Sequence, residues 1–215
     1  MIVSTRTLSK PQVAKRRTRS AFRRRRRRVA LVLGVGALAA LLATVVLPRL
    51  PDAVRELTLP LRHEDIIRQQ ASAKRLDPSL VAAVIYAESR FRDQTSHAGA
   101  RGLMQITPAT ARYIAHLSGG TRFEQGDLAT PQINISYGTY YLRHLLNRYD
   151  RNEVLALAAY NGGEGNVDRW VARAQTSERS LTTREIPFAE TREYVRQVLD
   201  VRGRYRSVYA SELGL

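Results

Sequence analysis

A glutamate at the end of a long apolar segment is the residue of this chain best suited to acid–base chemistry. In a helix, Val84 and Ile85 share a face with Glu88, because they precede it by four and three residues. A carboxyl group among aliphatic side chains is costly to ionise, so we expect the pKa of Glu88 to be raised toward the range useful for a general acid. The alternative interpretation is a helix-end ion pair with Arg90 or Arg92.

Three further motifs follow Glu88 and carry residues suited to binding a polar ligand. Gln105 can both donate and accept hydrogen bonds, which suits an acetamido or hydroxyl group. Gly102 lets a ligand approach the backbone closely, and Met104 fits a protein core and a ligand-binding surface equally well. Tyr160 and Asn161 precede a Gly-Gly helix stop, so capping and core roles are open to them as well. The motifs are residues 99–105 (Gly-Ala-Arg-Gly-Leu-Met-Gln), 159–163 (Ala-Tyr-Asn-Gly-Gly) and 190–195 (Glu-Thr-Arg-Glu-Tyr-Val).

Taken in this order, Glu88-Ser89 and the three later motifs resemble those of the lytic transglycosylases of bacterial peptidoglycan that have a lysozyme-like catalytic domain. The resemblance extends from about Ile66 to about Val201. It implies that one glutamate, Glu88, acts first as acid and then as base. The β-1,4 bond between N-acetylmuramic acid and N-acetylglucosamine breaks, and the C6 hydroxyl of the muramic acid closes a 1,6-anhydro ring. The resemblance implies neither a cofactor nor a metal ion.

The resemblance also implies which residues contact the glycan. Tyr194 matches the tyrosine whose hydroxyl approaches the catalytic carboxylate, and Ser96 is placed by its distance from Gly99. The sequence departs from the family pattern at Asp93, where a proline is usual, and at Gly162, where alanine is commoner. The implied substrate-binding residues are Ser96, Gly102, Met104, Gln105, Tyr160, Asn161 and Tyr194.

Two other functions are compatible with the same residues. Most glycosidases use two carboxylates, whereas here the substrate's own C6 hydroxyl would replace the second one by proximity. In a lysozyme-type muramidase, water would attack instead. An inactive glycan-binding scaffold of the cell wall is the third reading, and the presence of both Glu88 and Tyr194 argues against it.

The charge of the chain is concentrated near its N-terminus. The formal net charge is +16, and residues 1–28 hold 12 Lys or Arg and no Asp or Glu. An arginine-rich arm can bind nucleic acid or anionic lipid. The uncharged apolar segment that follows favours lipid, so no nucleic-acid partner is expected. The chain has no cysteine, and its four histidines lack metal-ligand spacing.

The composition predicts four consecutive parts. Residues 1–28 should be a disordered cytoplasmic arm, 29–47 a single transmembrane helix, 48–61 a proline-containing linker and 62–215 the lysozyme-like domain. The 19 residues of 29–47 would reach roughly 28 Å as a helix, close to the ~30 Å hydrocarbon thickness.

A cleaved signal peptide is the alternative for residues 29–47. Its small-residue site, Ala37-Leu38-Ala39, lies inside the apolar run rather than after it, which favours an uncleaved anchor. Arg23 to Arg28 should then stay cytoplasmic. The domain would face the periplasm or cell wall, with peptidoglycan strands and the membrane as its partners.

The remaining pattern is helical. Asp77 and Thr107 are expected N-caps, each followed by a proline at the first helical position. Since no long stretch alternates with period two, we predict an all-α domain with room for one short hairpin. The helices are expected over 63–76, 78–88, 108–117, 131–149, 153–160 and 191–206.

Overall fold

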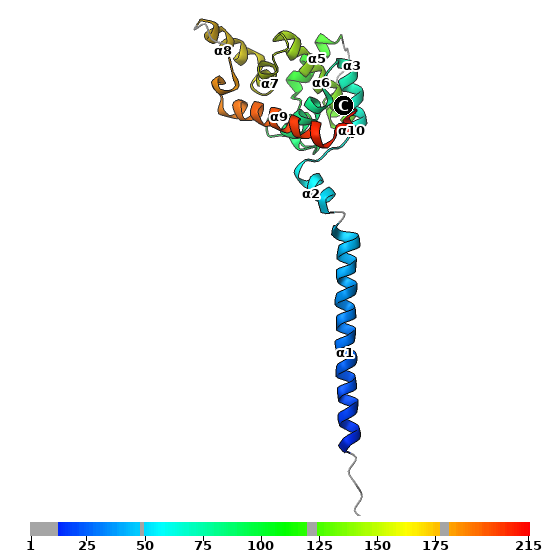
Figure 1. The fold of residues 1–215 in the computed structure, drawn as a ribbon. Coiled ribbons are helices and arrows are strands. Elements are labelled where there is room, and N and C mark those ends of the chain that lie inside the picture. The colour runs from blue at the N-terminus through cyan, green and yellow to red at the C-terminus, as the bar shows by residue number, and fades with distance from the viewer. Residues whose placement is uncertain (1–12, 48–49, 120–123, 177–180) are drawn as a thin grey trace, which may run out of the picture. The chain divides into compact units, whose positions relative to one another are not determined.

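The computed structural model describes residues 13–47, 50–119, 124–176 and 181–215 (Figure 1). The chain divides into two compact units, Met1–Arg55 and Glu56–Leu215, which are described separately.

The first unit is dominated by one long helix. Helix α1 (Val13–Leu41) continues into a π-helical turn, η1 (Leu42–Val46). Its segment Arg23–Val45 is long and apolar enough to cross a membrane. The predicted disorder of residues 1–28 differs from the structure at 13–28, which are helical, because arginine is a good helix former and an existing helix extends easily. Residues 1–12 lie outside the described residues.

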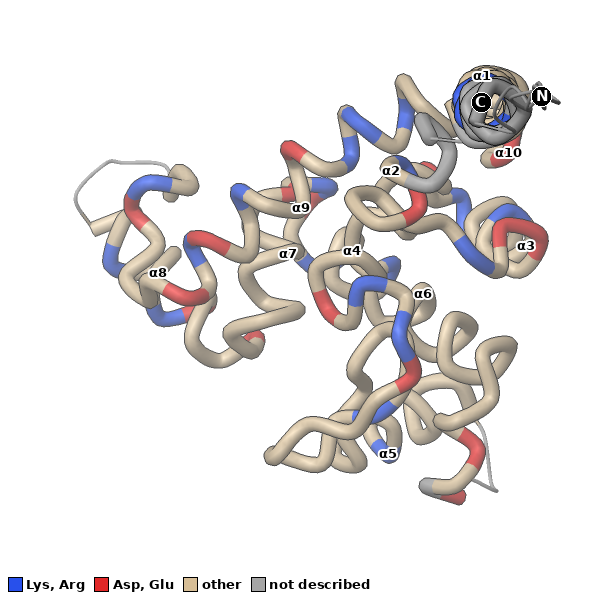
Figure 2. Tube along the Cα trace, turned by 90° about the horizontal axis from the view of Figure 1, so that it is seen from below, with Lys and Arg blue, Asp and Glu red and all other residues tan. Residues whose placement is uncertain are grey.

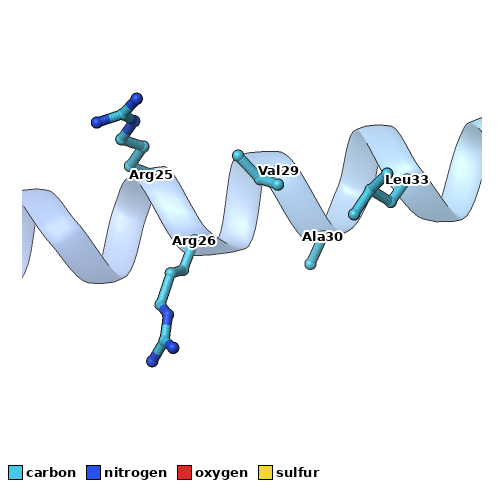
Figure 3. Close-up of a pocket in the computed structure, with 5 residues that line it drawn as sticks. All are labelled: Arg25, Arg26, Val29, Ala30 and Leu33. Atoms are coloured by element: carbon cyan, nitrogen blue, oxygen red, sulfur yellow. The ribbon is translucent and has the colours of Figure 1, made fainter.

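A shallow hollow on α1 is lined by Arg25, Arg26, Val29, Ala30 and Leu33. Figure 3 shows that all five come from neighbouring turns of this one helix, with Arg25 and Arg26 pointing to different sides. The hollow is the space between side chains on a single helix, and we assign it no ligand.

The predicted linker is partly helical and ends inside the folded domain. Helix α2 covers Leu50–Thr58, and the two residues after it, Leu59 and Pro60, are buried. Three tyrosine hydroxyls donate to consecutive backbone carbonyls here, so the domain starts before the predicted boundary at residue 62. The pairs are Tyr86 to Thr58 (3.3 Å), Tyr209 to Leu59 (2.8 Å) and Tyr205 to Pro60.

The domain is built from helices, as the sequence predicted. The part of the chain that the structure describes contains no strand, and the 95–106 loop has two isolated β-bridges in place of a hairpin. The main helices are α3 (Glu64–Lys74), α4 (Pro78–Ser89), α5 (Pro108–Leu117), α6 (Pro131–Arg148), α7 (Glu153–Gly162), α8 (Glu164–Thr176), α9 (Ala189–Val208) and α10 (Ala210–Leu213). Short 3₁₀ turns, η3 (Gln125–Ala129) and η4 (Thr183–Glu185), precede α6 and α9.

Both predicted N-caps are confirmed. The Asp77 carboxylate accepts from the Ser79 amide at 2.8 Å, and the Thr107 hydroxyl accepts from the Thr110 amide at 3.1 Å. Helix α8 was not predicted. Gly163, at φ +85°, stops α7, and the chain enters α8 at the next residue. The glycine pair therefore marks a change of direction rather than the start of a loop.

Helix α4 is the centre of the domain. Every residue from Ser79 to Tyr86 is buried, so the helix is covered on all sides, chiefly by α9 and α3. A helix that is apolar all round belongs in the interior of a domain. Figure 2 shows charged residues along α3, α8 and α9, whereas the tube of α7 is almost uncharged, as expected for a second interior helix.

The buried amide of Asn134 fastens the 101–106 loop to α6. Its Oδ1 accepts from the Met104 amide at 2.8 Å, and its Nδ2 donates to the carbonyls of Arg101 and Leu128, both at 2.9 Å. On the next turn of α6, a Cβ at Gly138 would lie 2.3 Å from the Met104 sulfur. The loop thus packs on α6 at a distance that only glycine permits.

We predict that Asn134→Ala destabilises the domain by about 2–4 kcal/mol, because it leaves the buried Met104 amide and the buried Leu128 carbonyl without a partner. Urea unfolding followed by circular dichroism measures the change. Asn147→Ala is the matched control, since Asn147 is exposed on the same helix and should change stability by less than about 0.5 kcal/mol. Equal effects of the two substitutions would contradict the role of Asn134.

Candidate functional site

Glu88 lies in the last turn of α4, where the buried helix reaches the surface. The residue is only partly exposed, and burial raises the pKa of its carboxyl to about 7. A hydrogen-bond contribution from the Tyr194 hydroxyl acts in the opposite direction. The sequence-based expectation of a raised pKa is confirmed, with desolvation as the main cause.

The alternative of an ion pair with a nearby arginine is wrong. Among the described residues no cation forms an ion pair with Glu88. The Arg90 guanidinium lies over the Tyr86 ring, 5.5 Å from its centre, and the Arg92 Nε donates to the Ser89 carbonyl at 3.5 Å. Both arginines therefore contact residues of α4 other than Glu88, and neither neutralises its carboxylate.

The end of α4 is held by its neighbours in the chain. The Ser89 hydroxyl is buried and donates to the Leu103 carbonyl at 2.8 Å, which joins the last helical turn to the 101–106 loop. Two left-handed residues follow, Arg90 (φ 52°) and Phe91 (φ 61°), and the Phe91 ring is buried. Non-glycine residues adopt this conformation at a cost. The packing of Phe91 therefore fixes a sharp turn directly after Glu88.

Tyr194 comes from α9, which packs along α4. Its hydroxyl is the one buried side-chain oxygen or nitrogen, within the described ranges, that has no partner of hydrogen-bond geometry. It nevertheless lies near enough to Glu88 to lower the pKa of that carboxyl as a donor. Burial and the proximity of Glu88 raise the pKa of Tyr194, which keeps its phenol protonated. The site thus holds a phenol donor beside the carboxyl, at a position just short of full hydrogen-bond geometry.

Tyr160 and Asn161 come from the last turn of α7. The Tyr160 hydroxyl donates to the Met104 carbonyl at 2.9 Å, and the nearby Glu88 charge contributes to raising the Tyr160 pKa. Asn161 is exposed, and its Oδ1 accepts from the Thr191 hydroxyl at 2.8 Å. The structure therefore brings Tyr160 and Tyr194 to Glu88, as predicted, and leaves the amide nitrogen of Asn161 open to solvent.

Two further predicted residues, Gln105 and Ser96, form hydrogen bonds within the loop after α4. Gln105 is partly exposed and donates through Nε2 to the carbonyls of Gly102 (2.8 Å) and Gln94 (3.0 Å), which leaves its Oε1 as an acceptor. The Ser96 hydroxyl accepts from the Ala100 amide at 3.1 Å. Both side chains therefore hold the loop together in this structure.

Gly102 and Met104 are not at the surface. Gly102 is buried at φ +75°, and a Cβ there would lie 2.2 Å from the Asn134 Nδ2, so the close approach is made by the protein rather than by a ligand. The Met104 side chain is fully buried, which decides between the two interpretations in favour of the core.

The sequence analysis did not identify Asn134, which holds the loop that carries Gly102 and Met104. A polar residue four positions before Gly138, on the apolar face of a predicted helix, could have indicated a buried hydrogen-bonding role.

No second carboxylate of the described residues shifts the pKa of Glu88. The site therefore differs from the two-carboxylate arrangement of most glycosidases. It offers an acid that is protonated near neutral pH and a phenol donor beside it. The 101–106 loop adds the partly exposed amide of Gln105, and the end of α7 adds the exposed amide of Asn161.

The chain is similar in sequence to known transglycosylases. Residues 65–182 match the model of the transglycosylase SLT domain. The soluble lytic murein transglycosylase of Escherichia coli K12 is 34% identical over 150 residues, which cover 68% of this chain and 23% of the relative. The membrane-bound lytic murein transglycosylase C of Sodalis glossinidius is 30% identical over 164 residues, covering 66% and 46%. The chain thus spans about a quarter of the length of the first curated relatives that it matches.

The fold is similar to that of a solved relative. An inactive Glu-to-Gln mutant of the lytic transglycosylase Slt from Pseudomonas aeruginosa superposes with a TM-score of 0.66 at 32% identity, covering 73% of this chain and 26% of that one. Since the SLT domain match covers more than half of the sequence and the helical architecture agrees, this chain belongs to the transglycosylase SLT domain family, with its lysozyme-like fold.

Proposed function

We propose that this protein is a membrane-anchored peptidoglycan lytic transglycosylase in which Glu88 is both acid and base. The observation that carries the proposal is the Glu88 carboxyl, with a pKa raised to about 7 and no second carboxylate acting on it. The family membership and the names of the relatives support the substrate class. The inactive relative carries a Glu-to-Gln change, which agrees with dependence on a glutamate.

In the first step, protonated Glu88 gives its proton to the glycosidic oxygen. The bond from C1 of the muramic acid to that oxygen breaks, and positive charge develops on C1. In the second step, the Glu88 carboxylate takes the proton of the C6 hydroxyl while that oxygen bonds to C1. The ring closes as a 1,6-anhydro sugar, Glu88 is protonated again, and no water is consumed.

The Tyr194 hydroxyl favours the ionised form of Glu88, whereas burial favours the protonated form. This hydroxyl can donate to the carboxylate that exists between the two steps, while desolvation favours the neutral acid that starts the cycle. Tyr160 donates to the Met104 carbonyl, and the Glu88 charge contributes to raising the Tyr160 pKa. We expect the amides of Gln105 and Asn161 to contact the sugar substituents.

The anchoring part of the proposal rests on α1. Its segment Arg23–Val45 has the length and composition of a membrane span, and one relative is named membrane-bound. The arginines at the start of that segment favour a cytoplasmic N-terminus, which would place the domain on the side of the membrane where peptidoglycan lies. The basic residues would contact anionic lipid.

The mass of the released muropeptides tests the reaction directly. A lytic transglycosylase yields anhydro ends that are one water lighter than the ends left by a hydrolase. Mass spectrometry of peptidoglycan digested by the purified protein should therefore show anhydro products. Fully hydrated ends would instead identify a lysozyme-type muramidase on the same fold.

We predict that Glu88→Gln abolishes glycan cleavage, because the amide has the same shape but no acidic proton.

The same substitution should change how stability depends on pH. Between the unfolded pKa of about 4.5 and the folded pKa of about 7, folded Glu88 binds more protons than unfolded Glu88, so its contribution to stability falls as pH rises through this window. The variant should therefore unfold at higher urea than the wild type at pH 8. Glu193→Gln is the control, since Glu193 is exposed on α9 and should leave activity unchanged. Turnover by Glu88→Gln near the wild-type rate would refute the mechanism.

We predict that kcat/KM falls as pH rises through about 7, where Glu88 loses its proton in the free enzyme. Tyr194→Phe removes the donor that favours the anion, so the fall should move to higher pH. The maximal rate should drop on the order of 10²-fold, the scale of a misplaced acid–base group. A pH profile of both proteins measures this. An unchanged profile in the variant would remove Tyr194 from the mechanism.

We predict that the mature protein retains residues 29–47. Intact-mass or N-terminal sequencing of the protein extracted from membranes checks this, and a chain starting near Leu50 would show a cleaved signal peptide. Replacement of Arg23 to Arg28 by glutamine should increase the fraction of chains with inverted topology, as read by protease protection. An unaltered topology would mean that other residues set the orientation.

A further inference from the structure

A row of aromatic rings leads away from Glu88. Tyr160, beside the carboxyl, has its ring centre 5.5 Å from that of Tyr141 on α6, and the Tyr141 ring is 6.5 Å from that of Tyr113 on α5. The last ring is at the surface, where Tyr113 is 39% exposed, while Tyr141 is buried. The row therefore connects the proposed catalytic carboxyl to an exposed tyrosine two ring-to-ring steps away.

The exposed tyrosine is held in place by its neighbours. Its ring meets Tyr141 edge-on at 88°, and its hydroxyl is 3.3 Å from the Nε2 of His144. The His144 ring stacks on Tyr141 at an interplanar angle of 10°. These contacts already restrict the Tyr113 ring, so it loses little further freedom when a ligand binds to it.

The support continues into α8 through Glu164. This carboxylate accepts from the Tyr141 hydroxyl at 3.2 Å and from the Arg148 Nε at 3.2 Å, and it lies 3.6 Å from the His144 Nε2. Arg148 also pairs with Asp168 at 2.7 Å. Three helices, α5, α6 and α8, thus cooperate to orient one exposed ring and the imidazole beside it.

We propose that Tyr113 and His144 form a sugar-binding position for a glycan unit away from the bond that is cleaved. A pyranose presents an apolar C–H face, which stacks on an aromatic ring, and polar groups at its edge, which can bond to a hydroxyl and an imidazole. The position lies two ring-to-ring steps from Tyr160, through the buried Tyr141 ring, and the inference assigns it to a later unit of a strand that has one unit at Glu88. The inference rests on the proposed function, because it assumes a polymeric glycan.

Binding to the Glu88→Gln variant tests the inference without cleavage. The probes are peptidoglycan strands stripped of their stem peptides and separated by length into disaccharides and long oligosaccharides. We expect Tyr113→Ala, made in the Glu88→Gln background, to weaken binding of the long strands about three- to tenfold by calorimetry. Disaccharide binding should stay unchanged, because the inference assigns Tyr113 to a unit of the strand beyond those bound at Glu88.

Three further variants separate binding from structure. Leu117→Ala removes a side chain of similar exposure from the same helix and should not alter affinity. Tyr113→Phe keeps the stacking face and should retain most of the affinity for long strands. His144→Ala removes the hydroxyl's partner and should cause a smaller loss than Tyr113→Ala. Urea unfolding of each variant shows whether the fold is intact.

The binding measurements test the sugar-binding position separately from the proposed reaction, which the released products test. Unchanged affinity of Tyr113→Ala for long strands, or an equal loss for both lengths, would overturn the inference. Tyr113-dependent binding in a protein that releases no anhydro products would leave the inference standing and refute the proposed reaction. Failure of the Glu88→Gln variant to bind strands of any length would refute both.

Discussion

The burial of one carboxyl group at the end of an interior helix is the constraint on which the site depends. Ionising Glu88 in a desolvated position is unfavourable, and its pKa of about 7 expresses that cost. The apolar packing of α4 along its whole length offsets this unfavourable free energy. The same burial that destabilises the ionised form near neutral pH keeps an acid protonated there. Stability and reactivity therefore oppose one another at this residue.

The surroundings of Glu88 are fixed by polar side chains that bind backbone groups. Asn134 satisfies three backbone groups of the loop region, Ser89 joins α4 to the loop, and Tyr160 closes it from α7. Each replaces water by a protein partner, which is the condition for burying backbone without loss of stability. The loop that carries Gln105 is thereby positioned from α4, α6 and α7.

Tyrosine hydroxyls fulfil several roles in this domain. Tyr86, Tyr205 and Tyr209 bind the carbonyls of residues 58–60 and fix where the chain enters the fold. Near Glu88 the Tyr194 hydroxyl lowers the pKa of the carboxyl, and we propose a part in the proton chemistry for it and sugar binding for Tyr113. A tyrosine combines a large apolar body with one polar end, so the surroundings of that end decide its role.

The sequence by itself determined the helical class, the N-caps at Asp77 and Thr107, the apolar segment of α1 and the candidate acid Glu88, because each depends on local pattern or composition. It also placed Tyr160 and Tyr194 near Glu88 through family resemblance. The tertiary structure decided the rest. It placed Met104 and Gly102 in the interior, excluded an arginine partner for Glu88, and showed that residues 58–60 belong to the domain. These outcomes depend on contacts between residues far apart in the chain, such as Asn134 with Met104 and Tyr209 with Leu59, and local spacing carries no information about such pairs.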